Sequence, residues 1–292
     1  GWVSRMPELP EVETIRRGLL PIVGHTIVGC DVRRRDVVRD RTNSSHNPRR
    51  GGIEPSALGV GSVVDELVRL GKQLGIAVRD PCGQERVIVV QLGMSGQVSL
   101  VDSARIPDAK HVHLVWALDD ARRVCFRDAR RFGGVTLLGS RSDLDGFWAP
   151  LGPDALEITA GQLRDGLGTS TRAIKAALLD QGVIAGVGNI YADEALHHAA
   201  INPCERCSDL RTDQIRALAK AIRGVLREAI NARGSTLRDY RDPSNEPGEA
   251  QLMHRVYARA GLACLSCGHV IEQCRIAQRS TCWCPVCQPI NR

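Results

Sequence analysis

The sequence lacks long hydrophobic runs and a secretion signal. Its apolar stretches, such as residues 87–90 and 184–187, are far shorter than the roughly 20 residues that a membrane-spanning helix needs. The N-terminus has no charged start followed by an apolar middle and a small-residue cleavage site. These absences exclude a membrane helix and argue against secretion, so we expect a cytoplasmic protein.

The pattern of cysteines does not indicate a disulfide framework either. The chain has 11 cysteines, an odd number, and no secretory signal accompanies them. Six of the 11 fall within residues 264–292. This asymmetry indicates a metal site near the C-terminus.

Composition and charge allow a packed protein with a polyanionic partner. With 43% hydrophobic and 25% charged residues, the 292 residues suffice for two domains and a small module. The net charge is +6. Arginines cluster at positions 33–35, 49–50, 122–123, 127 and 130–131. Such clusters suit phosphate binding, but a solvated basic surface has the same composition.

The hydrophobic pattern changes along the chain. Residues 8–23 have the spacing of an amphipathic helix. Strand-like runs then follow at 27–32, 62–68, 74–78, 87–92, 112–116 and 135–138. A polar segment at 41–61 interrupts them as a surface insertion. After 150–153 the pattern is helical, over 159–166, 172–180, 190–199 and 212–232. We expect an α+β protein with a β-sandwich or barrel followed by a helical domain.

The C-terminal cysteines have the spacing of a zinc site. Cys264 and Cys267 form one CxxC knuckle, Cys284 and Cys287 form a second, and 16 residues separate them. Two such knuckles complete a tetrahedral thiolate shell around one structural Zn²⁺. Metal binding would supply much of the folding free energy of so short a module. Cys274 and Cys282 lack this spacing, and the Cys204–Cys207 knuckle has no matching partner.

The N-terminal region contains the run Met6-Pro7-Glu8-Leu9-Pro10-Glu11. A proline that begins a chain carries a free secondary amine, which can attack an aldehyde-level sugar carbon and form an iminium. An α-amine has a reference pKa of about 8, against about 10.4 for lysine, so more of it is unprotonated near neutrality. Glu8 could move protons beside it. The same prolines also fit the start of a helix, and spacing alone favours that simpler interpretation.

Several separate motifs resemble the bacterial formamidopyrimidine-DNA glycosylases. The resemblance extends from Pro7 to Cys287 and rests on the following segments: Pro7-Glu8-Leu9-Pro10-Glu11-Val12-Glu13, Leu70-Gly71-Lys72, Leu92-Gly93-Met94-Ser95-Gly96, Lys110-His111-Val112-His113, Asp128-Ala129-Arg130-Arg131-Phe132-Gly133, Ala185-Gly186-Val187-Gly188-Asn189-Ile190-Tyr191-Ala192 and Ala277-Gln278-Arg279. It implies three parts: an N-terminal helix plus β-sandwich (7–150), a helix-two-turn-helix domain (151–250) and a zinc finger (251–292).

The resemblance also implies roles for individual residues. Pro7 would attack the sugar, Glu8 would manage protons, and Lys72 and Arg279 would assist elimination. Met94, Arg130 and Phe132 would fill the gap left by a flipped nucleotide. His111, Lys175 and Asn189 would contact the DNA, and residues 235–248 would form a loop that contacts the lesion. The expected substrate is 8-oxoguanine or a ring-opened purine in double-stranded DNA, which would place the protein at the nucleoid. We expect a monomer without a nucleotide cofactor.

The sequence departs from the family at two positions. Six residues, 1–6, precede Pro7, so its nitrogen is an amide unless they are removed. They could be a vector remnant, a start site placed too early or a real extension, and we expect activity only from a chain that begins at Pro7. Family members often have lysine where Thr171 stands, and Arg172 or Lys175 could carry that charge here.

Two other functions remain open from the sequence. One is the related endonuclease VIII type of glycosylase, which removes oxidised pyrimidines. The other is a non-catalytic zinc-finger protein that binds DNA without needing a free Pro7 amine. Excision assays on 8-oxoguanine and thymine-glycol duplexes separate the first from our prediction, and the N-terminal mass of the native protein separates the second.

Overall fold

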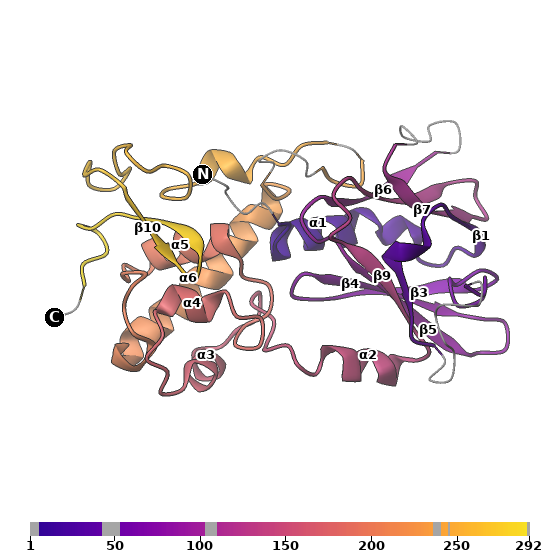
Figure 1. Ribbon diagram of the computed structural model, residues 1–292, viewed down its shortest axis with the longest axis horizontal. Helices are drawn as coiled ribbons and strands as arrows, with labels where there is room; N and C mark the ends of the chain where they lie inside the picture. Colours follow the sequence, from indigo (N-terminus) through magenta and orange to yellow (C-terminus); the bar gives the residue numbers. More distant parts are fainter. Residues whose placement is uncertain (1–5, 43–52, 103–109, 236–240, 245, 291–292) are drawn as a thin grey trace.

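The computed structural model describes residues 6–42, 53–102, 110–235, 241–244 and 246–290. They form two lobes that lie side by side, one rich in strands and one rich in helices (Figure 1). Parts of the expected insertion at 41–61 and of the expected loop at 235–248 lie outside the described residues. Within the described residues, no helix is long and apolar enough to span a membrane.

The first lobe consists of two facing sheets and the helices that flank them. Its helices are α1 (Leu9–Gly18), η1 (Leu20–Ile22), η2 (Arg35–Val37) and α2 (Arg141–Trp148). Its strands are β1 (Ile27–Val32), β2 (Val38–Asp40), β3 (Val63–Leu70), β4 (Gln73–Arg79), β5 (Glu85–Gln91), β6 (Gly96–Val101), β7 (Val112–Leu118), β8 (Arg123–Asp128) and β9 (Gly134–Leu138). One sheet has the order β1-β7-β8-β6 and the other β2-β9-β5-β4-β3.

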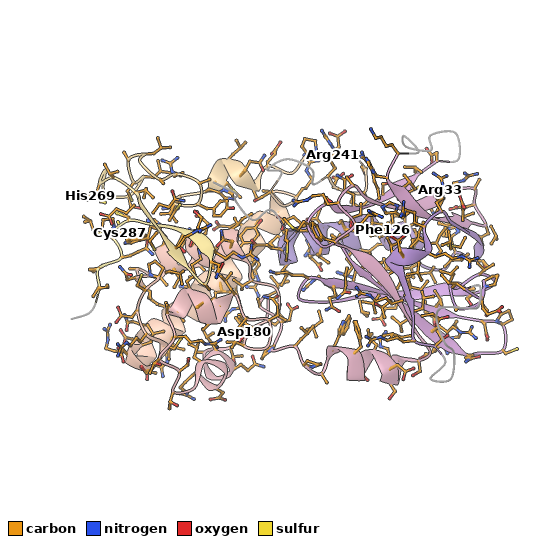
Figure 2. All side chains as sticks on the ribbon, viewed as in Figure 1. Arg33, Phe126, Asp180, Arg241, His269 and Cys287 are labelled. Atoms are coloured by element: carbon orange, nitrogen blue, oxygen red, sulfur yellow. The ribbon has the colours of Figure 1, made fainter. Side chains whose placement is uncertain are left out.

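The core of this lobe lies between the two sheets. Val12 and Ile15 on one face of α1 pack in the same apolar cluster as Ile88 of one sheet and Phe126 of the other. Phe126 is fully buried there, and Figure 2 labels it in the strand-rich lobe. The helix therefore covers the sandwich because its apolar residues recur at helical spacing.

Helix α2 covers the outer face of the five-stranded sheet. Leu144 of α2 packs against Val87, Val89 and Leu138 in a separate apolar cluster. Ser140 accepts a hydrogen bond from the amide of Asp143 at 3.1 Å and so begins the helix. The sequence pattern predicted no helix between residues 24 and 150. The presence of α2 there corrects this expectation.

The second lobe is helical and carries the C-terminal hairpin. Its elements are α3 (Ala160–Leu167), α4 (Ile174–Leu178), α5 (Asn189–His198), η3 (Cys207–Asp209), α6 (Thr212–Asn231), η4 (Ala250–Met253), β10 (Glu272–Ile276) and β11 (Arg279–Trp283). Its core forms between α5 and α6, with Leu196 and Leu218 fully buried. Leu9 of α1 belongs to this same cluster, so the first turn of α1 packs into the other lobe.

Candidate active site and metal site

Glu8 lies at the junction of the two lobes, one residue before α1. Its carboxylate accepts hydrogen bonds from the backbone amides of Gly188 at 2.8 Å, Ile190 at 2.9 Å and Tyr191 at 3.4 Å. These amides belong to the N-terminus of α5, which favours a negative charge. A Cβ at Gly188 would collide with Glu8 Cδ, so the close approach requires glycine.

Glu8 is nevertheless a carboxylate removed from water. It is 3% exposed. Burial raises its pKa above the ordinary value, although the charge of Lys72 and the helix amides lower it. Because its ionised form is destabilised, Glu8 can hold a proton closer to neutrality than an exposed glutamate can.

A second buried carboxylate, Glu11, lies one turn further along α1. Its Oε2 accepts the backbone amide of Glu8 at 2.8 Å, and its Oε1 accepts the Tyr191 hydroxyl and the Ser235 amide, both at 2.7 Å. Burial, followed by the charge of Glu8, raises the pKa of Glu11 to about 7. Ser235 Oγ also lies 3.2 Å from His254 Nε2. The sequence motifs assigned no role to Glu11, and its place in the N-terminal motif was the available signal.

Pro7 and Lys72 line one cavity. The cavity has a volume of about 380 Å³, and Met94 and Phe132 also line it. Burial lowers the pKa of Lys72, the charges of Glu8 and Glu11 oppose this, and Arg279 lowers it further. The fold thus brings together Pro7, Lys72, Met94 and Phe132, which lie far apart in the sequence. Met6 precedes Pro7 in this chain, so the nitrogen of Pro7 is an amide here.

Two loops carry Met94, Arg130 and Phe132 at the edge of this cavity. Phe132 is 62% exposed, and the guanidinium carbon of Arg130 lies 5.1 Å from the centre of its ring. The buried Asp128 holds the loops together, because its carboxylate accepts the Ser95 hydroxyl and the amide of Gly133, the latter at 2.7 Å. An exposed aromatic side chain on a fixed loop is available to contact a ligand.

His111 lies beside this loop through its backbone. Its carbonyl accepts the amide of Asp128 at 3.0 Å, and its φ of 68° is in the left-handed region. The neighbouring His113 is buried, with Nε2 2.7 Å from the Asp128 carbonyl oxygen. His111 therefore lies beside the loop that carries Arg130 and Phe132.

Lys175 lies in a different environment from the one expected for a DNA contact. Its side chain is fully buried, and Nζ lies 2.6 Å from Asp193 Oδ1 and 3.0 Å from the carbonyl oxygen of Ser280. The expectation that Lys175 grips a phosphate is therefore corrected: its charge is used inside the protein. The side-chain amide of Asn189, which is 5% exposed, donates to the same Ser280 carbonyl at 3.0 Å. Both residues connect the helical lobe to β11.

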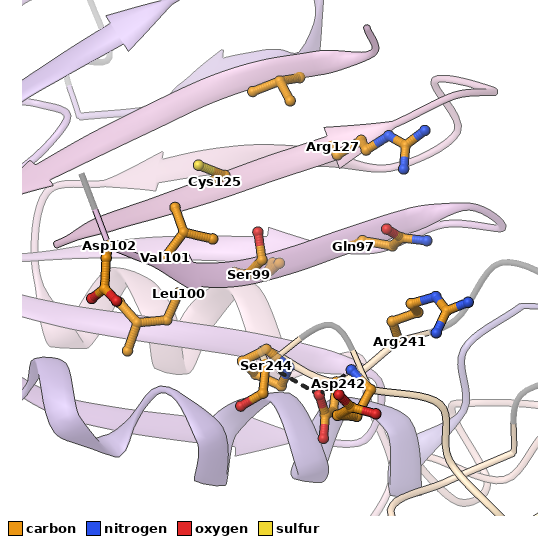
Figure 3. A pocket seen from close by; sticks show the side chains of 14 residues that line it. Gln97, Ser99, Leu100, Val101, Asp102, Cys125, Arg127, Arg241, Asp242 and Ser244 are labelled. Atoms are coloured by element: carbon orange, nitrogen blue, oxygen red, sulfur yellow. Dashed lines mark hydrogen bonds between the residues drawn. The ribbon is translucent and has the colours of Figure 1, made fainter. Parts of the chain in front are cut away.

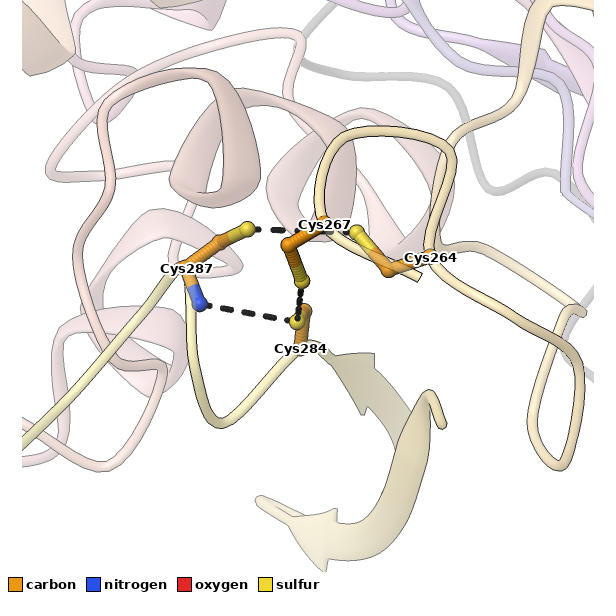
Figure 4. A group of neighbouring side chains, drawn as sticks. All are labelled: Cys264, Cys267, Cys284 and Cys287. Atoms are coloured by element: carbon orange, nitrogen blue, oxygen red, sulfur yellow. Dashed lines mark hydrogen bonds between the residues drawn. The ribbon is translucent and has the colours of Figure 1, made fainter. Parts of the chain in front are cut away.

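The four cysteines of the two knuckles converge on one point (Figure 4). Their sulfurs lie within 4.8 Å of one another, with 3.4 Å between Cys267 and Cys284 and 3.9 Å between Cys264 and Cys287. Four sulfurs bound to Zn²⁺ at about 2.3 Å would be about 3.8 Å apart, so the cluster fits this ion. Neither Cys274 nor Cys282 belongs to it.

The metal module is attached to α5 by two acidic side chains. The backbone amides of Arg255 and Val256 donate to Glu194 at 2.9 and 3.0 Å, and the amide of Cys282 donates to Asp193 at 3.0 Å. The exposed Arg279 begins β11 and is therefore held at a fixed place relative to the helical lobe. Its charge lowers the pKa of Lys72.

A second cavity opens on the sandwich lobe. Its volume is about 630 Å³, and strands β6 and β8 and the segment around Asp242 line it. Figure 3 shows Gln97, Arg127 and Arg241 at one end of this cavity. The segment is docked on the sheet, because the amide of Leu100 donates to the carbonyl of Pro243 at 3.1 Å.

The arginine clusters of the sequence are only partly available to a ligand. Arg33 pairs with Asp31 at 2.9 Å, and Arg34 pairs with Asp36 at 3.1 Å. Arg122 pairs with Asp120 beside the β7–β8 turn. The net positive charge is thus less concentrated than the sequence alone indicates.

Comparison with protein families gives matches along most of the chain. Residues 6–135 match the formamidopyrimidine-DNA glycosylase N-terminal domain, and residues 151–241 match the H2TH domain of the same family. Residues 261–290 match a zinc finger found in FPG and IleRS.

Individual proteins give the same result. A formamidopyrimidine-DNA glycosylase from Laribacter hongkongensis is 40% identical, over 97% of this chain and 100% of that protein. One from Chloroflexus aurantiacus is 42% identical, over 97% and 98%. The crystal structure of MutM (Fpg) from Thermus thermophilus has a TM-score of 0.80 at 37% identity, covering 98% and 100% of the two chains. The Lactococcus lactis Fpg in complex with DNA containing an abasic site has a TM-score of 0.82 at 31% identity, over 97% and 99%.

Proposed function

The chain belongs to the formamidopyrimidine-DNA glycosylase family, and we propose that it excises oxidised purines from double-stranded DNA and then cleaves the strand at the resulting abasic site. Its substrates would be 8-oxoguanine and formamidopyrimidines, and its place of action the nucleoid. The observation that carries this proposal is the convergence of Pro7 and Lys72 on one pocket, beside the buried Glu8, which lies close enough to Lys72 for each charge to shift the pKa of the other group.

The chemistry requires Pro7 to begin the chain, because in a peptide bond the lone pair of its nitrogen is delocalised into the carbonyl and is not available for attack. The amine attacks C1′ of the damaged nucleotide and the bond from C1′ to the base breaks. The nitrogen then gives up its proton and the bond from C1′ to the ring oxygen breaks, which leaves an iminium between Pro7 and the opened sugar. Glu8 delivers the proton that the departing base or the opening sugar needs, which its burial at the α5 N-terminus supports.

Lys72 and Arg279 would act in the steps that follow. Burial lowers the pKa of Lys72, so its amine gives up a proton more readily than an exposed lysine and can serve as a base for β-elimination. Arg279 would bind the phosphate that leaves in the second, δ-elimination. The two groups are close enough for the charge of one to affect the other.

The DNA would lie across the junction of the lobes. Extrusion of a nucleotide costs a few kcal/mol of stacking, and Met94, Arg130 and Phe132 would restore part of it by entering the gap. The exposure of Phe132 and its contact with Arg130 support this role. His111 would contact the DNA backbone near these loops and Asn189 would contact it at the start of α5, whereas we assign Lys175 to the attachment of the zinc module.

We further assign three domains: residues 7–150, 151–250 and 251–292. One structural Zn²⁺ held by Cys264, Cys267, Cys284 and Cys287 would stabilise the third domain. Its chemical task would be indirect, since a closed four-thiolate shell leaves no position for substrate. The zinc would instead fix the hairpin that presents Arg279.

The test uses a chain that begins at Pro7 and a chain that begins at Gly1. Both are incubated with a duplex that contains one 8-oxoguanine, and the covalent intermediate is trapped with borohydride. The Pro7 chain should nick the duplex and be trapped, and the Gly1 chain should do neither while still binding the DNA. Equal nicking and trapping by both chains would refute the proposed nucleophile.

The substrate class is tested by comparing excision from the 8-oxoguanine duplex with excision from a matched duplex that contains thymine glycol. We expect faster excision from the 8-oxoguanine duplex, and faster excision from the thymine-glycol duplex would contradict the purine assignment. Glu8→Gln in the Pro7 chain should abolish base excision, because it removes the proton donor and keeps the shape of the side chain. Arg79→Met, at an exposed arginine of β4, is the control.

A further inference from the structure

Arg69 connects three segments of the chain near the end of β3. Its side chain is 7% exposed. Nε lies 3.0 Å from Glu13 Oε2 on α1, and Nη1 and Nη2 lie 2.6 and 3.1 Å from the two oxygens of Asp154, which lies before α3 at the start of the helical domain. A guanidinium that makes a two-bond contact with one carboxylate and a third bond with another has a single orientation.

The side chains of Arg69 and Asp154 also hold the backbone of Gly71, the residue before Lys72. The amide of Gly71 donates to Asp154 Oδ2 at 2.8 Å, and its carbonyl accepts Arg69 Nη1 at 3.0 Å. Gly71 has φ of +55°, and a Cβ there would lie 2.9 Å from Ala185 Cβ. Both polar groups of this residue's backbone are therefore fixed, and the turn is seated closely against Ala185.

Asp154 is bonded in turn to the segment that holds Glu8. It forms a parallel bridge with Ala185, whose amide donates to the carbonyl of Pro153 at 2.9 Å. One residue further on, the carbonyl of Gly186 accepts the amide of Leu9 at 3.1 Å. The turn that carries Lys72 and the helix that follows Glu8 are thus both attached to the short ladder formed by residues 153–155 and 185–186.

Glu13, one of the two carboxylates that Arg69 contacts, is ionised at neutral pH. Burial alone would raise the pKa of Glu13, but hydrogen bonds from Arg16, Arg17 and Arg69 lower it to about 2. Both carboxylates that Arg69 contacts are largely shielded from water. Removal of Arg69 would leave them without this partner, which is more costly than the loss of an exposed pair.

We propose that Arg69 and Asp154 are positioning residues that hold the Lys72 amine in place for strand cleavage, acting through the backbone of Gly71. This inference rests on the proposed function of Lys72. The Glu8 carboxylate is held by the amides of α5 and the amide of Leu9 by the Gly186 carbonyl, and these contacts do not use the side chain of Asp154. Loss of the contact between Asp154 and Gly71 should therefore impair elimination much more than base excision. A displacement of about 1 Å at a reacting group can reduce its rate about 100-fold.

The test compares Asp154→Asn with Arg79→Met, which removes a charged contact from the adjacent strand. Asp154→Asn keeps the shape of the side chain but turns one hydrogen-bond acceptor into a donor facing Arg69 or Gly71. On a duplex with a preformed abasic site, we expect strand cleavage by Asp154→Asn to fall at least about 10-fold. Borohydride trapping at Pro7 should stay within about twofold of the unmodified chain, and the control should change neither.

A double-mutant cycle with Lys72→Ala separates positioning from general destabilisation. If Asp154 acts through Lys72, adding Asp154→Asn to Lys72→Ala should produce no further loss of cleavage. A further loss equal to that in the single variant would overturn the proposal, as would a parallel fall of trapping and cleavage. Failure of the proposed function itself looks different: the unmodified chain that begins at Pro7 would then show neither trapping nor cleavage.

Discussion

Replacement of Lys175 by methionine should destabilise the protein without removing a DNA contact. The lysine and Asp193 are both fully buried, 2.6 Å apart, and the ammonium also donates to the Ser280 carbonyl. Without the lysine, the buried Asp193 carboxylate keeps only the hydrogen bond from the Cys282 amide and has no opposite charge beside it. Loss of one partner of a buried ion pair typically costs about 3–5 kcal/mol. Burial raises the pKa of Asp193 to about 7 even beside Lys175. The free energy of unfolding should therefore be measured at pH 8, where this carboxylate is charged in the unmodified protein.

Two measurements test this reasoning. Urea unfolding at pH 8 gives the loss of stability, and the double variant Lys175→Met/Asp193→Leu should recover part of it, because an apolar pair can replace a buried ion pair while the Cys282 amide loses its acceptor. The dependence of DNA affinity on salt gives the number of phosphate contacts, and the loss of one contact reduces the slope by about 0.9. A reduced slope together with unchanged stability would show that Lys175 faces the DNA and that our assignment is wrong.

Three further predictions follow from the site. Gly188→Ala should reduce base excision at least about 100-fold, since the added Cβ displaces the Glu8 carboxylate, and an unchanged single-turnover rate would contradict this. Thiol modification should release one zinc per chain and weaken DNA binding, while Cys274→Ser should retain the zinc measured by elemental analysis. The pKa of Glu11 is raised from 4.5 to about 7, so between pH 4.5 and 7 the folded chain binds a proton that the unfolded chain does not bind. The free energy of unfolding therefore falls as pH rises through this window. Glu11→Gln should remove about 3 kcal/mol of this fall, measured by urea unfolding at several pH values.

The strand and helix pattern was predictable wherever apolar residues dominate a segment. The strand expected at 27–32 is β1 with the same bounds, and the four helices expected after residue 150 all occur with ends that differ by at most two residues. Strands β2, β6 and β8 were missed. In β8, Arg123 and Arg127 flank the buried residues Val124, Cys125 and Phe126, and the two charges suggested a basic patch where a partly buried strand is present.

The candidate site was predictable as a set of residues but not as an arrangement. The family motifs identified Glu8 and Lys72, but the hydrogen bonds from α5 to Glu8 join residues about 180 positions apart and have no local signal. The error at Lys175 has a physical origin too. A lysine on a short amphipathic helix is ordinarily solvated, and only the tertiary fold shows that Asp193 and the Ser280 carbonyl surround it.

The placement of Leu9 has a consequence for how the protein can be divided. This side chain, at the start of the first helix, is completely enclosed by apolar residues of the helical lobe, while Val12 and Ile15 of the same helix are enclosed by the sandwich. An isolated helical fragment would therefore contain a hole where the leucine belongs, and an isolated sandwich would expose it to water. The two halves are not interchangeable modules, and fragments cut near residue 150 should fold well only when they are produced together.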